Sequence, residues 1–372
     1  PFVLWLPSRV PRCSLPGEVG PALLHERRRA FDRVLALEDR LPDRERTREC
    51  LLGGISIVFD ERLLHRLNRD GTAGCHTLGD LERFVERLIE HDIRYAFGIP
   101  GGPWIPYMEA MRQRGLPFTV VANEASAGFM ADVCYRLTGR PALCHGTFGP
   151  GATNLATGVG CAYLDRSALI AATTEPTDAM RRRVMQMNID HQALFAPITK
   201  QTVRADAATI ESLIDEAVRA ACAEVPGPVH IGLPSDLADQ KAAAAPPLGE
   251  PPGTPALAKS DRLAAAAETI GQAQRPLLAV GLTALRLGLG PQVLRLAEKL
   301  QAPLVLTPMA KGLVPEDHPL YAGVLFHARS DLMAEVIREA DLVVGIGYDP
   351  VEFNYESWLP EVALVHLDTR PA

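Results

Sequence analysis

The sequence has no paired cysteines, no long apolar run and no excess of basic charge. Its seven cysteines form no CxxC pair and are irregularly spaced, which argues against a structural zinc site or a disulfide framework. No apolar stretch reaches the roughly 18 residues of a membrane-spanning helix, and the opening PFVLWLP has no basic flank of the signal-peptide kind. The net charge of −7 does not fit a typical nucleic-acid-binding protein. We expect a cytoplasmic protein with reduced cysteines that uses neither a membrane nor a nucleic acid as a partner.

The composition is that of a globular protein with more than one domain. Of 372 residues, 47% are apolar and 22% are charged, which is ordinary for a protein with good cores, and the length suits two or three domains. The chain starts with Pro1 rather than Met and stops shortly after a strand-like VALVHL. These ends predict a fragment or a processed product whose last domain is truncated.

Four segments differ in their patterns. Residues 1–76 are rich in Arg and Leu without a sustained apolar stripe, so we expect a weakly structured extension with one short helix around residues 21–41. Residues 77–239 alternate between strand and helix patterns and form a first domain. Residues 240–256 are rich in Pro, Ala and Gly, which is typical of a linker. Residues 257–372 form a second unit of strands and helices.

Both domains are predicted to be α/β, with doubly wound parallel sheets. Apolar runs such as RYAFG, PFTVVANE and SALIAATTE are separated by helical patterns such as TLGDLERFVERLIEHD. Near-continuous apolar strands that alternate with helices indicate a parallel sheet covered on both faces. The second domain, with RPLLAVGL, APLVLTPM and ADLVVGIGYDP, is predicted to be Rossmann-like.

Three strand ends in the first domain carry unusual residues. They are GIPGG (98–102), NEAS (123–126) and GTFGPGATN (146–154). In open parallel sheets, ligands bind outside the carboxyl ends of the strands, and glycines let a flat ligand approach the backbone closely. Glu124 stands at the junction of an apparently buried strand and a helix, where a carboxylate is rare unless it is paired or used. The alternative is a structural role in which Glu124 stabilises the helix dipole.

Residues 77–239 resemble the pyrimidine-binding domain of thiamine-diphosphate enzymes of the acetohydroxyacid (acetolactate) synthase and pyruvate oxidase superfamily. FGIPGG, ANEASAGFMADVCYRLTG, GTFGPGATNLATGVGCAYLDRS and ALFAPITK match its motifs in order and spacing. Residues 256–372 resemble its central domain through KLQAPLVLTPMAKGLVPEDHPLYAG and ADLVVGIGYDP. The resemblance covers nearly 300 residues.

The resemblance implies a role for Glu124. In the family, the matching glutamate hydrogen-bonds the ring nitrogen N1′ of the cofactor's aminopyrimidine, so Glu124 is expected to be catalytic. The residues expected to bind the cofactor follow from the same motifs: Pro100, Gly101, Glu124, Thr147, Pro150, Gly151 and Asn154.

Several positions depart from the common family pattern. Phe148 stands where many relatives have Ser, Thr173-Thr174 replaces a Gly-Gln pair, and residues 186–188 replace a Phe-Gln-Glu segment. These positions shape the substrate site in relatives, so a plain acetohydroxyacid synthase specificity is not expected. His145 and His191 lie near these segments, and either could donate a proton, although packing or hydrogen bonding is the simpler role for each.

The resemblance also concerns the metal and a second cofactor. The family holds Mg²⁺ and the diphosphate in a third, C-terminal domain marked by Gly-Asp-Gly, and this sequence contains no Gly-Asp-Gly. We expect a chain without the diphosphate domain, inactive by itself and with no metal ligands of its own. Some relatives bind FAD on the central domain, but AVGLTALRLGLG and GIGYDP do not form a full GxGxxG, so FAD is a minor alternative.

The favoured function is acetolactate-synthase-like carboligation of a small 2-oxo acid after its decarboxylation. Two alternatives are a 2-oxo acid decarboxylase of the same superfamily and a non-catalytic homologue or regulatory subunit. The family places its active site between subunits, so a homodimer or larger homo-oligomer is expected.

Overall fold

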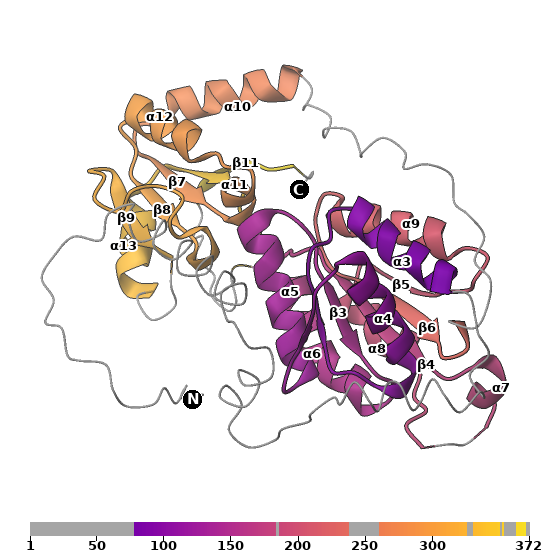
Figure 1. Ribbon diagram of the computed structural model, residues 1–372. Helices are drawn as coiled ribbons and strands as arrows, with labels where there is room; N and C mark the ends of the chain where they lie inside the picture. Colours follow the sequence, from indigo (N-terminus) through magenta and orange to yellow (C-terminus); the bar gives the residue numbers. More distant parts are fainter. Residues whose placement is uncertain are drawn as a thin grey trace, which may run out of the picture. The chain divides into compact units, whose positions relative to one another are not determined.

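The computed structural model describes residues 78–183, 186–237, 260–325, 330–349, 352 and 362–369. The predicted extension (1–76) and linker (240–256) lie outside the described residues. The remaining residues contain two parallel-sheet α/β domains, each drawn in its own colours in Figure 1. This confirms the predicted fold class, whereas the domain boundaries themselves stay a prediction.

The first domain contains six strands. Its elements in chain order are α3 (Leu78–Glu90), β1 (Ala96–Gly98), η2 (Gly102–Trp104), α4 (Ile105–Arg114), β2 (Phe118–Val120), α5 (Glu124–Thr138), β3 (Leu143–Gly146), α6 (Pro150–Leu164), β4 (Ile170–Glu175), α7 (Asp178–Arg181), α8 (His191–Phe195), η3 (Ala196–Ile198), β5 (Gln201–Arg204), α9 (Ile210–Cys222) and β6 (Val229–Pro234). The strands lie in the order β2-β1-β3-β4-β6-β5, and every neighbouring pair is parallel.

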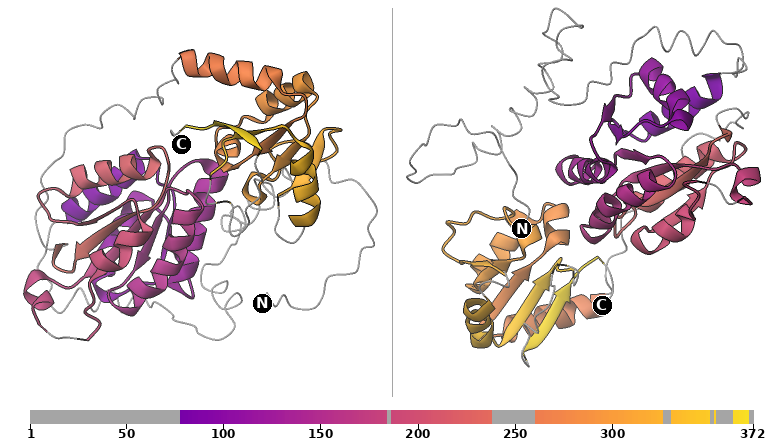
Figure 2. Two further views of the ribbon diagram at one scale, coloured as in Figure 1. Left: turned by 180° about the vertical axis from the view of Figure 1, so that it is seen from behind. Right: turned by 90° about the horizontal axis from the view of Figure 1, so that it is seen from below.

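Helices cover both faces of this sheet. Along β3, Leu143 packs into a core with residues of α3, α4 and α9, whereas the next residue, Cys144, packs into a second core with α5 and α6. This alternation is the period-two pattern of a strand buried on both faces. Figure 1 shows the two sets of helices on opposite sides of the sheet, and Figure 2 shows the same layers from other directions.

Local sequence signals set the helix ends that frame the site. The helix α4 ends at Gly115, which has a φ of 76°. The helix α5 begins after Asn123, whose side chain accepts a hydrogen bond from Ala125 N, and ends at Gly139 with a φ of 71°. Such left-handed positions favour glycine.

The second domain is a five-stranded parallel sheet. Its elements are α10 (Ser260–Gln272), β7 (Pro276–Val280), α11 (Leu282–Arg286), α12 (Gly290–Leu300), β8 (Leu304–Leu306), η5 (Pro308–Ala310), β9 (Tyr321–Val324), α13 (Ser330–Glu339), β10 (Leu342–Ile346) and β11 (Ala363–Leu367). The strand order is β11-β10-β7-β8-β9. Residues of α12 pack on one face of this sheet, and Ile337 of α13 packs on the other.

One expectation about the first domain is wrong. The strand before Glu124 was expected to be buried, but β2 lies at the edge of its sheet and Val120 is 57% exposed. The apolar run PFTVVA does not reveal this, because a strand's place in a sheet depends on pairing with distant segments.

Candidate functional site

The carboxyl ends of β2, β1 and β3 lie next to one another. Gly98, the last residue of β1, is in register with Val120 of β2 on one side and His145 of β3 on the other. The segments that follow these strands are the three that the sequence singles out, namely 98–102, 123–126 and 146–154. The sheet order therefore brings them to one edge, as a ligand site in an open parallel sheet requires.

Glu124 is a buried carboxylate with one oxygen held. Its exposed fraction is 6%, and its Oε2 accepts a hydrogen bond of 3.1 Å from the side-chain amide of Asn154. No described residue donates to Oε1 or forms an ion pair with Glu124. A buried carboxylate normally has such a partner, so the free Oε1 is available to a ligand.

The capping of α5 does not need Glu124. The side chain of Asn123 accepts the hydrogen bond of 2.9 Å from Ala125 N, so a neutral residue satisfies this amide at the helix start. A carboxylate in the first turn still interacts favourably with the helix dipole, although an exposed one would do so without the cost of burial. The structural alternative therefore explains less of the geometry than a binding role does.

Glycine backbones line the space beside Glu124. A Cβ added to Gly151, in the first turn of α6, would lie 3.2 Å from Glu124 Oε1 and 2.9 Å from Thr147 Cγ2. A Cβ on Gly101 would lie 2.8 Å from Thr147 Oγ1. Any side chain at Gly151 would crowd Thr147 and Oε1 of Glu124, and any side chain at Gly101 would crowd Thr147. Pro100 and Pro150 flank the two glycines at the start of their turns, and Pro150 opens α6.

Two further glycines bring α5 and α6 together. The Cβ positions of Gly128 and Gly158 would each fall 2.7 Å from the Cα atom of the other residue. Only glycine permits such a close approach of two helix backbones. This contact fixes the start of α5, with Glu124, relative to the start of α6, with Asn154. All seven predicted site residues therefore lie at one edge of the sheet, and their binding role stays a proposal.

Both candidate histidines are buried and neutral. His145 stacks on Trp104 with 3.8 Å between ring centroids, its Nδ1 lies 3.1 Å from Ala172 O, and burial lowers its pKa to about 3. Burial also lowers the pKa of His191 to about 4. Histidines with such pKa values are not in the imidazolium form at neutral pH, so they lack the acidic proton of a general acid, and the packing and hydrogen-bonding roles are favoured.

Sequence reasoning marked Thr173 and Thr174 as departures from the family pattern but missed Glu175 and His230, which lie behind the site with them. Thr174 Oγ1 lies 3.3 Å from Thr147 Oγ1, and Thr173, His230 and Glu175 are buried nearby. The available signal was the polar end of β4, Thr-Thr-Glu, which follows an apolar run.

Family comparisons match both domains. Residues 81–194 match the family described as thiamine pyrophosphate enzyme, N-terminal TPP binding domain. Residues 263–372 match thiamine pyrophosphate enzyme, central domain. The chain belongs to the thiamine pyrophosphate enzyme family. Its first domain is the TPP-binding domain of the family and its second is the central domain, which confirms the resemblance seen in the sequence.

Individual relatives differ in their named activities. The chain is 32% identical over 298 residues to the acetolactate synthase of Bacillus subtilis, covering 77% of this chain and 51% of that protein. It is 33% identical over 308 residues to a protein of Pseudomonas aeruginosa named as a probable 2-ketoarginine decarboxylase, covering 79% and 54%. The chain thus spans about half the length of the curated relatives it matches.

Solved structures share the fold. One is an enzyme of Mycobacterium smegmatis assigned provisionally as thiamin diphosphate-dependent, with a TM-score of 0.65 and 27% identity, covering 77% of this chain and 56% of that one. Another is the thiamine diphosphate-dependent 4-hydroxybenzoylformate decarboxylase of Rhodococcus jostii, with a TM-score of 0.66 and 23% identity, covering 78% and 56%.

The residues of the first domain fit the aminopyrimidine of the family's cofactor. A flat heterocycle needs a narrow space between backbones and a carboxylate oxygen for its ring nitrogen. Glycine at positions 101 and 151 keeps further side-chain atoms away from this edge, and Gly151 lies next to Oε1 of Glu124.

The edge of the central domain at the carboxyl ends of its strands does not fit a flavin nucleotide. The carboxylate of Glu352 accepts hydrogen bonds from the backbone amides of Leu282 (2.9 and 3.0 Å) and Asp349 (2.9 Å). A Cβ on Gly281, at the end of β7, would lie 2.6 Å from Glu352 Oε1. The backbone amide that would bind a phosphate thus already donates to the Glu352 carboxyl group, which disfavours FAD at this edge.

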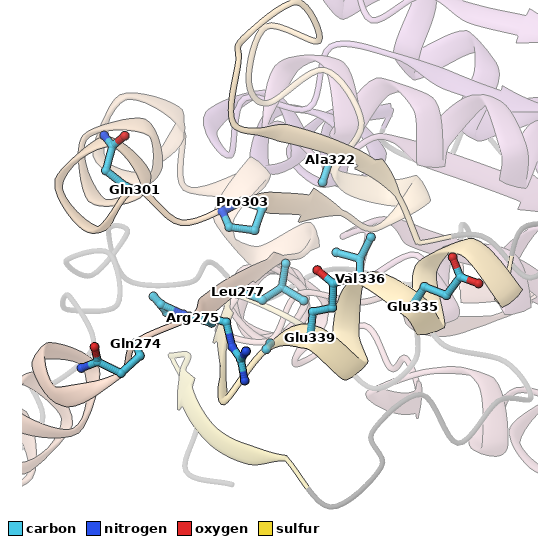
Figure 3. A pocket seen from close by; sticks show the side chains of 11 residues that line it. Gln274, Arg275, Leu277, Gln301, Pro303, Ala322, Glu335, Val336 and Glu339 are labelled. Atoms are coloured by element: carbon cyan, nitrogen blue, oxygen red, sulfur yellow. The ribbon is translucent and has the colours of Figure 1, made fainter.

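A hollow of about 580 Å³ lies at the opposite edge of the central sheet. Figure 3 shows Arg275 and Leu277 near the start of β7, Pro303 before β8, and Glu339 of α13 around it. It lies at the amino ends of the strands, away from the edge where open parallel sheets bind ligands.

Among the described helices, none has the length and apolar character that crossing a bilayer requires.

Proposed function

We propose that this chain provides the pyrimidine-binding and central domains of a thiamine-diphosphate-dependent enzyme that acts on a small 2-oxo acid. The observation that carries the proposal is the buried carboxylate of Glu124, with Oε2 held by Asn154 and Oε1 facing a glycine-lined space. The family membership of both domains supports it.

Each site residue has a distinct part in the proposal. Glu124 would hold a proton at Oε1 for the aminopyrimidine ring of the cofactor, and Asn154 fixes the orientation of the carboxylate. Gly101 and Gly151 admit the ring, while Pro100 and Pro150 fix the turns on either side of it. Thr147 packs between the two glycines. Bound thiamine diphosphate supplies the electron sink that lets a 2-oxo acid lose carbon dioxide.

The diphosphate and Mg²⁺ do not fit the residues of this site. Mg²⁺ prefers oxygen ligands from carboxylates, phosphates and water, and Glu124 is the single carboxylate among the proposed site residues. We therefore propose that Mg²⁺ and the diphosphate are held by residues other than those of the two described domains. The 372-residue chain alone should be inactive and should bind the cofactor more weakly than micromolar in calorimetry with Mg²⁺. Micromolar binding would contradict this part of the proposal.

Carboligation is the favoured reaction and decarboxylation is the second candidate. Relatives named as acetolactate synthases support the first, and the similarity to a probable 2-ketoarginine decarboxylase supports the second. Product analysis of the complete enzyme with pyruvate separates the two, because carboligation gives acetolactate and decarboxylation gives acetaldehyde. Without turnover of pyruvate, other 2-oxo acids are the next substrates to test.

The decisive experiment replaces Glu124 with Gln in the complete enzyme. Glutamine keeps the size and one hydrogen-bonding oxygen but not the proton-holding carboxylate, so deuterium exchange of the cofactor's C2 proton should slow by about 10²–10⁴. Quenched NMR measures the exchange. The control is Glu216→Gln, at an exposed position on α9, which should leave it unchanged.

A purely structural carboxylate gives the opposite result. Glu124→Gln would then lower stability by about 0.3–1 kcal/mol and leave C2 exchange at the wild-type rate. A wild-type enzyme without measurable exchange would instead support a non-catalytic homologue.

A further inference from the structure

A buried network of hydrogen bonds connects the turn before α6 to the far side of the sheet. We call it the histidine network, and its members are Gly149, His191, Thr173, His230, Thr202, Gln192 and Glu175. Gly149 stands between Thr147 and Gly151 of the proposed site. The network thus starts inside the proposed site but lies almost entirely outside it.

The first half of the network contains two histidines that share one hydroxyl. Gly149 N donates to His191 Nε2 over 3.3 Å. Thr173 Oγ1 lies 2.8 Å from His191 Nδ1 and 2.8 Å from His230 Nε2. The exposed fractions of Thr173, His191 and His230 are 0%, 2% and 0%, so water does not supply alternative partners.

The second half ends at a carboxylate. His230 Nδ1 lies 2.7 Å from Thr202 Oγ1, the Thr202 hydroxyl donates to Gln192 Oε1 over 2.7 Å, and Gln192 Nε2 donates to Glu175 Oε1 over 2.6 Å. Beside the other Glu175 oxygen lies Arg204, with Nη1 3.4 Å from Oε2. Burial raises the pKa of Glu175, and the hydrogen bond from Gln192 and the charge of Arg204 oppose this shift.

The two ends of the network impose one direction on every hydrogen bond. The Gly149 amide can only donate, so His191 Nε2 accepts and the His191 proton is on Nδ1. Thr173 then accepts from His191 and donates to His230 Nε2, which places the His230 proton on Nδ1 as well. From the other end, the Gln192 amide nitrogen donates to Glu175 and the Gln192 carbonyl accepts from the Thr202 hydroxyl. Thr202 has then donated its single proton, so it accepts from His230 Nδ1. Both ends of the network therefore place the His230 proton on Nδ1.

A strand glycine makes room for the last hydrogen bond. A Cβ on Gly232, in the middle of β6, would lie 2.0 Å from Glu175 Oε1 and 2.6 Å from Gln192 Nε2. Glycine in a strand interior often marks such a close approach. The absence of a side chain at Gly232 therefore leaves room on the sheet for the hydrogen bond between Glu175 and Gln192.

We propose that His191 is a positioning residue, locked as the neutral Nδ1–H tautomer by the histidine network, that holds the Gly149 turn in place. Gly149 has a φ of 71° and is followed directly by α6, which presents Gly151 and Asn154 to Glu124. Holding the Gly149 amide fixes where α6 starts. The network does not conduct protons. The amide groups of Gln192 and Gly149 cannot switch between hydrogen-bond donor and acceptor as hydroxyl groups can.

A metal site is the competing explanation for the same cluster. Potential ligand atoms of Glu175, His191 and His230 all lie within 4.8 Å of one another. However, the Thr173 hydroxyl already bonds both ring nitrogens, and an ion bound to them would have to displace it. The one-way network leaves no nitrogen of the two rings without a partner.

The first test measures the histidine tautomers of the 372-residue chain by NMR with ¹⁵N-labelled histidine. Both His191 and His230 should be neutral with the proton on Nδ1. A proton on Nε2 of either ring would overturn the proposal. So would stoichiometric Zn²⁺ binding that is lost in His191→Ala, because it would show a metal site. Neither result depends on a bound cofactor.

The second test uses Thr173→Val, with Thr173→Ser as its matched control. Valine keeps the size but removes the shared hydroxyl, so the Nδ1–H of His191 loses its acceptor and only the 3.3 Å contact with the Gly149 amide still favours this tautomer. We therefore expect a mixture of the two His191 tautomers, and exchange of the Gly149 amide should rise about tenfold. Serine should preserve the wild-type tautomer and the wild-type exchange. Unchanged tautomer and exchange in Thr173→Val would overturn the proposal. If the variant does not fold, the wild-type tautomers decide the question alone.

The link to catalysis rests on the proposed function and has its own readout. In the complete enzyme, Thr173→Val should lower kcat about tenfold with KM for the 2-oxo acid little changed, and Thr173→Ser should restore it. If the wild-type tautomers are as proposed but Thr173→Val leaves kcat unchanged, only the positioning role of His191 in catalysis is overturned. An enzyme without thiamine-diphosphate activity would overturn the proposed function and leave the tautomer result standing.

Discussion

Asn154 Nδ2 donates a hydrogen bond of 3.1 Å to Glu124 Oε2 across the contact between α5 and α6. The two residues are thirty positions apart, and the close pair Gly128 and Gly158 holds their helices together. The bond fixes one carboxylate oxygen and leaves the other facing the glycine-lined space. Orientation of Glu124 therefore depends on α6.

Asn154→Ala should impair catalysis without unfolding the protein. Asn154 itself is exposed, but its loss leaves the buried Glu124 carboxylate without this donor, so stability should fall by about 1–3 kcal/mol. Misplacement of a catalytic group can cost about 10²-fold in rate, and we expect kcat to fall toward that value. Steady-state kinetics and thermal melting of the same sample measure the two effects. A lower melting temperature with full activity would contradict the role of Asn154.

Gly151→Ala should weaken cofactor binding, whereas Gly160→Ala on the same helix should not. A Cβ at position 151 would lie 2.9 Å from Thr147 Cγ2 and 3.2 Å from Glu124 Oε1, but at position 160 the nearest atom would be 3.7 Å away. In a helix interior, alanine is better than glycine by about 0.5–1 kcal/mol, so Gly160→Ala should melt higher. Equal cofactor affinity in both variants would show that the space beside Glu124 is not the binding site.

Self-association should depend on the outer face of α5. Phe129, Val133 and Leu137 are 41%, 47% and 70% exposed and are spaced four residues apart, so they form one apolar stripe. We propose that this stripe belongs to a homodimer or larger homo-oligomer interface. Val133→Glu should shift the protein toward monomer in sedimentation, whereas Leu263→Glu, at an exposed leucine of α10, should not. A monomeric wild type would contradict the proposal.

The first domain should lose stability on acidification below about pH 6.5. Burial lowers the pKa of His145 to about 3 and of His191 to about 4, and it lowers the pKa of His230 well below its ordinary value. Unfolded histidines take up protons near pH 6.5, so between that pH and the folded values the unfolded state binds more protons. The free energy of unfolding should therefore fall by about 1.4 kcal/mol per pH unit for each histidine, until the pH reaches its folded pKa.

Denaturant unfolding at several pH values measures this slope. His145→Phe keeps a ring for the stack on Trp104 and removes one of the three protons, so its slope should be about one third smaller. An unchanged slope would show that His145 does not contribute.

The sequence by itself predicted both parallel-sheet domains and the three strand-end segments, one of which contains Glu124. These features depend on short-range rules. Apolar periodicity marks strands and helices, and parallel strands collect their ends at one edge. The resemblance then supplied the cofactor and the expected role of Glu124.

Only the tertiary structure decided which side chains meet. The edge position of β2 follows from the strand order β2-β1-β3, and sequence order does not reveal it. The histidine network joins Thr173 to His230, which is 57 residues away. The close approach of Gly128 to Gly158 likewise requires two packed helices. Such contacts are set by how strands pair and helices pack, and a local pattern carries no information about a partner that arrives from a distant strand.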